Sequence, residues 1–143
     1  MEHKYTPSKL AIICLKAYEK TAFNVEFVYA DASLYRCTIL NTVGYRKTKQ
    51  KYLSIVEDCN KQTNNDFVLY GDMAVSLTNV KDMEVNKIDG SVSVLNIRLN
   101  SGSVLKFHLK TRYAYALFHY YRKQKSLFLK KQKSANPEFS YLV

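Results

Sequence analysis

The stretch from residue 91 to residue 133 most constrains the fold, because two segments of β-strand pattern precede one long segment of helical pattern. Residues 100–103, Asn-Ser-Gly-Ser, join the two strands, and Asn and Gly accept the positive φ that a tight hairpin turn requires. In the second strand, Leu105, Phe107 and Leu109 alternate with polar residues, which predicts one buried and one wetted face. These elements predict a hairpin against which a C-terminal helix packs.

The N-terminal third predicts one helix and two strands. Thr6 is a suitable helix cap, Pro7 suits the first helical position, and apolar residues then recur at helical spacing, so we expect a helix over 7–22. Residues 24–29 and 34–40 have the composition of neighbouring strands.

In the middle of the chain, 44–51 predicts a basic loop or strand edge, 52–56 fits either a short strand or a helical turn, and 58–66 predicts a surface loop. Residues 67–70 and 73–77, joined by Gly71-Asp72, predict a hairpin. A strand over about 80–85 ends before the turn at Asp89-Gly90. The apolar alternation in 92–99 changes phase, which predicts a bulge or bend.

The expected fold class is α+β: an N-terminal helix, then a curled antiparallel sheet or small barrel of about seven strands, closed by a long C-terminal helix. A chain of 143 residues has the length of one domain. We assign residues 1–136 to a single domain and residues 137–143 to a short tail.

Two resemblances to known families involve the second half of the chain. Residues 75–85, the Asn100-Ser101-Gly102 turn between two strands, and the terminal helix resemble the pleckstrin-homology-like superfold, especially its bacterial members. This resemblance implies a PH-like barrel, although that family usually carries a Trp in its terminal helix and this chain has none. Asn79-Val80-Lys81, Asn100-Ser101-Gly102 and Tyr120-Tyr121-Arg122 are similar to the bacterial competence transcription factor family.

Positive charge is concentrated at the C-terminal end. The net charge is +10, but residues 1–89 carry 12 basic and 11 acidic residues, whereas residues 90–143 carry 10 basic residues and one acid, Glu138. A one-sided basic surface attracts phosphate, on nucleic acid or on lipid headgroups.

The predicted terminal helix carries most of these cations and no acid to offset them. One interpretation is a phosphate-binding helix, and the other is an ordinary lysine-rich helix end, because cations also suit a helix C-terminus. Lys outnumbers Arg, which favours contacts to the phosphate backbone over the reading of base edges. The candidate phosphate-binding residues of this region are Arg112, Arg122, Lys123, Lys125, Lys130, Lys131 and Lys133.

Aromatic residues precede these cations in the same helix. Most are expected to pack the helix onto the sheet, and one or two to remain outside, where they could stack on bases. The candidates for stacking are Tyr115 and Tyr121.

A second group of cations, Arg46, Lys47, Lys49 and Lys51, lies in the predicted basic loop. These residues are candidate phosphate contacts, and the alternative is an exposed edge that deters strand pairing.

The sequence predicts no enzyme, no cofactor and no metal site. Cys14, Cys37 and Cys59 have no paired spacing, no carboxylates stand at a spacing that would complete a metal site with the histidines, and the four glycines are scattered rather than grouped into a phosphate loop. No hydrophobic run is long enough to span a membrane, and no signal peptide is recognisable, so we expect a cytoplasmic protein.

Three functions fit these observations. The first is a regulatory or accessory protein that binds nucleic acid through the basic helix. The second is a PH-like adaptor that binds an anionic membrane surface or a protein partner. The third is an inhibitor protein of a phage or mobile element. Oligomeric state is not predicted.

Overall fold

The structure, a computed structural model, describes residues 5–19, 22–40 and 44–135. It is α+β, with two antiparallel sheets and a C-terminal helix. Contacts divide the chain into two units, Met1–Lys81 with Ile97–Leu105, and Asp82–Asn96 with Lys106–Val143.

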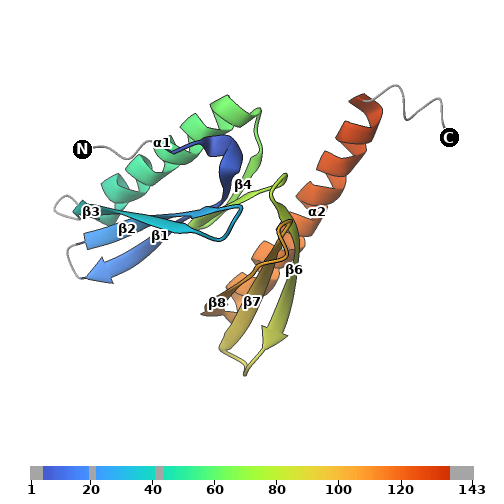
Figure 1. The fold of residues 1–143 in the computed structure, drawn as a ribbon. Helices are drawn as coiled ribbons and strands as arrows, with labels where there is room; N and C mark the ends of the chain where they lie inside the picture. The colour runs from blue at the N-terminus through green and yellow to red at the C-terminus, as the bar shows by residue number, and fades with distance from the viewer. Residues whose placement is uncertain (1–4, 20–21, 41–43, 136–143) are drawn as a thin grey trace. The chain divides into compact units, whose positions relative to one another are not determined.

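The first sheet has five strands in the order β3-β2-β1-β5-β4 and is crossed on one face by helix α1 (Figure 1). A single turn of 3-10 helix, Pro7–Lys9, precedes it. Its elements are β1 (Leu10–Glu19), β2 (Ala22–Tyr29), β3 (Leu34–Leu40), α1 (Tyr45–Thr63), β4 (Phe67–Tyr70) and β5 (Met73–Ser76).

The predicted N-terminal helix is wrong, because the segment forms the central strand β1. Every residue from Leu10 to Leu15 is at most 5% exposed, so alternate side chains on both faces of the strand are buried. An uninterrupted apolar run of this kind suits a strand covered on both sides, and it also contains the i, i+3, i+4 spacing of a helix. Only tertiary pairing, with β2 on one side and β5 on the other, distinguishes the two.

The predicted basic loop, the undecided segment 52–56 and most of the predicted polar loop form one helix, α1. Thr48, Tyr52, Val56 and Cys59 are its buried residues, at spacings of four, four and three. The helix ends at Asn64, whose left-handed backbone (φ 56°) is a common helix C-cap.

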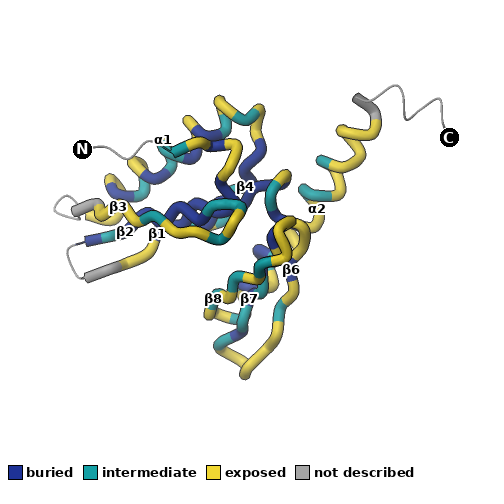
Figure 2. The backbone as a smooth tube through the Cα atoms, in the orientation of Figure 1, coloured by how far each residue is buried: buried dark blue, intermediate teal, exposed yellow. Residues whose placement is uncertain are grey.

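The α1 face of the first sheet forms a hydrophobic core. Ile13, Val25 and Phe27 from the strands are buried in one cluster with Tyr52 and Val56 from α1. The buried Tyr52 hydroxyl donates a 2.6 Å hydrogen bond to the Ile13 carbonyl, so this polar group has a partner inside the cluster. Figure 2 shows these buried segments of the first sheet and of α1 in dark blue.

The predicted hairpin at Gly71-Asp72 is confirmed as β4 and β5, which pair from Tyr70↔Met73 to Phe67↔Ser76. Gly71 has φ 61°, a conformation that glycine adopts without a steric cost.

The second sheet has three strands in the order β6-β7-β8, namely β6 (Val80–Lys87), β7 (Val92–Leu99) and β8 (Val104–Lys110). The predicted hairpin turn before β8 is confirmed, with Gly102 at φ 96°. The bulge or bend predicted in β7 leaves no mark on its burial, which alternates regularly through Ser93, Leu95, Ile97 and Leu99. Ser93 takes an inward position by sharing a 2.8 Å hydrogen bond with the Thr111 hydroxyl.

The predicted seven-strand barrel is not present, since the described residues form eight strands in two sheets without barrel closure. After β3 the chain forms α1 instead of another strand, and β5 then pairs with β1, so the first sheet is complete before β6 begins. The C-terminal helix is confirmed as α2 (Thr111–Ala135). The tail, 137–143, lies outside the described residues.

Candidate nucleic-acid interface

Among the α2 side chains whose burial is described, those that are buried all lie in the first half of the helix. Ala114, Leu117 and Tyr121 are at most 1% exposed, and their spacings of three and four residues place them on one helix face. None of the residues from Arg122 to Lys133 is buried. The packing that anchors α2 therefore ends at Tyr121.

Most of the predicted cations of α2 lie opposite this buried face. Successive residues of a helix point about 100° apart. On that basis five of these cations point within about 100° of one another, and their mean direction is roughly 180° from that of the buried residues. All are exposed. We call this set the basic face: Arg112, Arg122, Lys123, Lys130 and Lys133.

Two predicted cations of α2 lie outside the basic face. Lys125 is only partly exposed, and its Nζ lies 5.7 Å from the centroid of the Phe128 ring. Lys131 is exposed but lies about 100° from Lys130, on the far flank of the helix. The basic face therefore holds five of the seven predicted residues.

No acidic residue occurs in α2, and within the described ranges none of the basic-face cations forms an ion pair with an acid. The Arg122 guanidinium lies 5.3 Å from the centroid of the Phe118 ring, a contact that leaves its charge uncompensated. Surface helices usually mix both signs of charge at i, i+4 spacing, so α2 presents an unusually one-sided positive potential.

The two predicted stacking residues have different environments. Tyr115 is 37% exposed and lies within the basic face, whereas Tyr121 is 1% exposed and belongs to the buried face. Tyr121 does not present a ring to a base and is removed from the candidate site. Its spacing from Leu117 was the available signal, since i, i+4 apolar positions share a face.

His119 is a candidate that we did not predict from the sequence. Its exposed imidazole lies one turn from Tyr115, with ring centroids 6.4 Å apart and planes 27° apart. It also meets the Phe118 ring edge-on at 5.3 Å. The i, i+4 spacing of an aromatic and a histidine in a basic helix was the signal that could have identified this pair.

The second predicted group of cations lies on the first half of α1, within the first unit. Arg46, Lys47 and Lys51 are exposed. Lys49 is engaged locally: its Nζ lies 2.6 Å from Asp72 Oδ1 and also donates to the Gly71 carbonyl. Lys49 therefore tethers α1 to the β4–β5 turn, and the other three cations lie on a different helix and in a different unit from the basic face.

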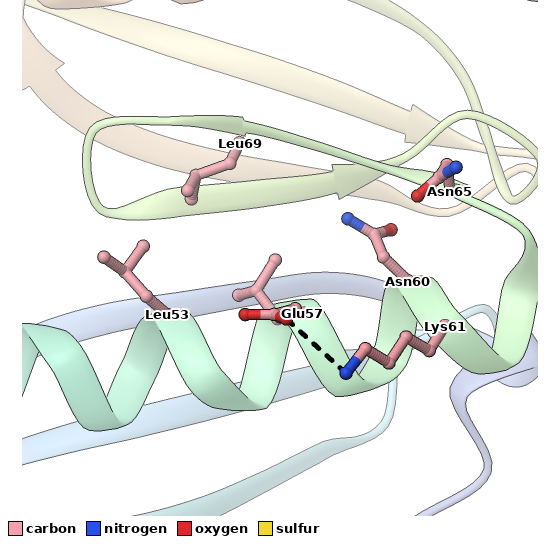
Figure 3. Close-up of a pocket in the computed structure, with 7 residues that line it drawn as sticks. Leu53, Glu57, Asn60, Lys61, Asn65 and Leu69 are labelled. Atoms are coloured by element: carbon pink, nitrogen blue, oxygen red, sulfur yellow. Dashed lines mark ion pairs between the residues drawn. The ribbon is translucent and has the colours of Figure 1, made fainter.

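A pocket of about 490 Å³ lies between α1 and β4 (Figure 3). Its charged residues compensate each other, because Lys61 Nζ lies 3.5 Å from Glu57 Oε1. Asn60 occupies part of the strand edge, since its carboxamide accepts from the Phe67 N–H at 2.8 Å and donates to the Phe67 carbonyl at 3.2 Å. The remaining lining residues are Leu53, Val56, Asn65 and Leu69, so the pocket offers no excess of positive charge.

The buried polar groups of the first sheet satisfy one another. The Glu26 carboxylate accepts from Arg36 Nε at 2.8 Å and lies 3.2 Å from Lys16 Nζ and 3.8 Å from the Cys14 thiol. Burial, aided by this carboxylate, raises the pKa of Cys14 to about 12, and burial raises that of Cys59 to about 11. Both thiols therefore stay protonated at neutral pH and are poor nucleophiles.

Within the described ranges, no group of three His, Cys, Asp or Glu side chains converges in a way that could hold a metal ion. Neither described helix has a stretch long and apolar enough to cross a bilayer. Comparison with known proteins finds no matching family model, no matching curated protein and no matching solved structure.

Proposed function

We propose that this protein binds nucleic acid through the basic face of α2. The observation that supports this function is the arrangement of five exposed cations opposite the buried face, in a helix that contains no acid. Cations in such an array displace condensed counterions from a phosphate backbone, which is the main source of sequence-independent affinity for nucleic acid.

The apolar residues of the second half of α2 favour nucleic acid over a membrane surface. Leu127 and Leu129 are each 51% exposed, and Phe128 is half-buried. Successive residues point about 100° apart, so these three side chains do not form one stripe. A helix that lies in a membrane interface needs a continuous apolar face to insert, and this half of α2 has none.

The composition of the basic face favours contacts to the backbone. Lys123, Lys130 and Lys133 outnumber Arg112 and Arg122, and Lys binds phosphate as a point charge, whereas Arg is the better bidentate partner of guanine. We therefore expect binding that tolerates changes of base sequence.

The test compares two variants that lose the same charge from different helices. Lys123→Gln, Lys130→Gln and Lys133→Gln together remove three cations from the basic face, and Arg46→Gln, Lys47→Gln and Lys51→Gln remove three from α1. Fluorescence anisotropy with a labelled oligonucleotide at about 50 mM salt should show an affinity about 30-fold lower for the α2 variant. The α1 variant should stay close to wild type.

Two outcomes would contradict the proposal. Equal losses in both variants would mean that only net charge matters. Absence of binding to any oligonucleotide at low salt would remove the function, and binding to vesicles with acidic lipid in the same buffer would then support the PH-like adaptor.

A further inference from the structure

We infer that the nucleic acid bound by α2 is single-stranded and that Tyr115 and His119 form the platform on which one of its bases stacks. This inference rests on the proposed function and narrows it to a ligand class. The observation that supports it is that the stacked rings of Tyr115 and His119 are exposed and lie among the cations of the basic face.

The two rings are placed for an external partner. Both side chains are exposed, Tyr115 at 37%, although aromatic rings in the same helix, such as Tyr121, are buried almost completely. Their near-parallel planes, 27° apart, resemble offset stacking more than edge-to-face packing. A flat base can extend such a stack without any change in the helix.

The surrounding charges complete the binding surface. Arg112 precedes Tyr115 by one turn, and Arg122 and Lys123 follow His119 by one turn, so cations flank the ring pair at both ends along the helix axis. Proteins that bind single strands without sequence preference combine a cationic track with aromatic platforms in this way. In a duplex the bases are paired and stacked inside, and the rings would add nothing to the phosphate contacts.

The experiment measures the affinity of the whole chain for two probes at the same salt concentration: oligodeoxythymidine of about 20 nucleotides, and a blunt duplex of equal length. The test variant is Tyr115→Ala with His119→Ala. The control is Tyr120→Ala, which removes an aromatic ring of similar exposure, 38%, from a position about 140° away around the helix. Thermal unfolding of each variant checks that the fold is kept.

The inference predicts that wild type prefers the single strand, and that the double variant binds it at least about 5-fold more weakly with duplex binding unchanged. Tyr120→Ala should leave both affinities unchanged. If the double variant binds the single strand as wild type does, or loses affinity for both probes equally, the stacking platform is overturned. In those cases, weaker binding by the variant with Gln at positions 123, 130 and 133 would still support the proposed function. Wild type that binds neither probe would contradict the proposed function and the stacking platform together.

Discussion

The two helices of this chain are both rich in cations, but they use them differently. α1 has buried residues along most of its length, and two of its lysines form ion pairs, Lys49 with Asp72 and Lys61 with Glu57. α2 has no acid, and from Arg122 to Lys133 it has no buried residue. The difference teaches that the count of basic residues does not identify a binding surface. The pairing of the charges and the extent of the buried face do.

The largest expected effect concerns where the packing of α2 ends. Leu117→Ala removes a fully buried side chain and should lower the free energy of unfolding by about 3 kcal/mol. Leu127→Ala removes the same atoms from a residue that is 51% exposed and should change it by less than about 0.5 kcal/mol. Urea denaturation measures both, and similar losses would show that the second half of α2 is packed.

The next effect contrasts a buried carboxylate with an exposed one. Glu26→Ala removes the carboxylate that Lys16 and Arg36 contact and leaves the Cys14 thiol beside a void, so we expect a loss of about 2 kcal/mol. Glu57→Ala breaks the exposed pair with Lys61 and should cost only about 0.3 kcal/mol. Equal midpoints of chemical denaturation for the two variants would contradict this ranking.

A single acidic substitution can give cations of α2 an ion-pair partner, as Lys49 and Lys61 have in α1. Ser126 is exposed and lies four residues from both Arg122 and Lys130, so Ser126→Glu should form i, i+4 pairs and raise helix stability by about 0.5 kcal/mol. The same change should weaken oligonucleotide binding about 10-fold, because it places a negative charge among the cations of the basic face. Gln124→Glu is the control, since it adds the same charge about 160° away. Binding that strengthens in Ser126→Glu would rule out the basic face as the site.

The effect that is smallest at neutral pH concerns the buried thiols of the first unit. Their pKa values in the folded chain, about 12 for Cys14 and about 11 for Cys59, are above the ordinary thiol value of 9.0. A raised folded pKa means that the stabilisation is complete below pH 9 and is lost as the pH rises towards 11–12. Cys14→Ala should therefore flatten the alkaline fall in stability, and a colorimetric thiol reagent at pH 8 should modify the exposed Cys37 much faster than the other two cysteines.

The local sequence pattern was sufficient to predict turns and helices whose own residues determine their backbone conformation. The turns at Gly71 and Gly102 demand positive φ, and the first half of α2 has apolar residues at helical spacing, so these elements were predicted correctly. Leu10 to Leu15 could not be assigned from periodicity, because a strand buried on both faces and a buried helix have the same apolar run. In α1, exposed Lys and Gln side chains conceal the four-residue spacing of Thr48, Tyr52 and Val56.

The candidate site was predicted in composition but not in arrangement. Counting charges in the sequence identifies the cations of α2. Only the position of the buried face shows that Lys125 and Lys131 lie outside the basic face and that Tyr121 is buried. Likewise, the pairing of Lys49 with Asp72 joins residues from separate elements, which no local pattern contains.

The salt dependence of binding tests the central claim most directly. If the basic face contacts phosphates, the slope of log K against log salt for a single strand should become shallower by about 2 when Lys123, Lys130 and Lys133 are changed to Gln. The slope should not change when Arg46, Lys47 and Lys51 are changed instead. A wild-type slope in the α2 variant, or an equal decrease in both variants, would contradict the assignment of binding to the basic face.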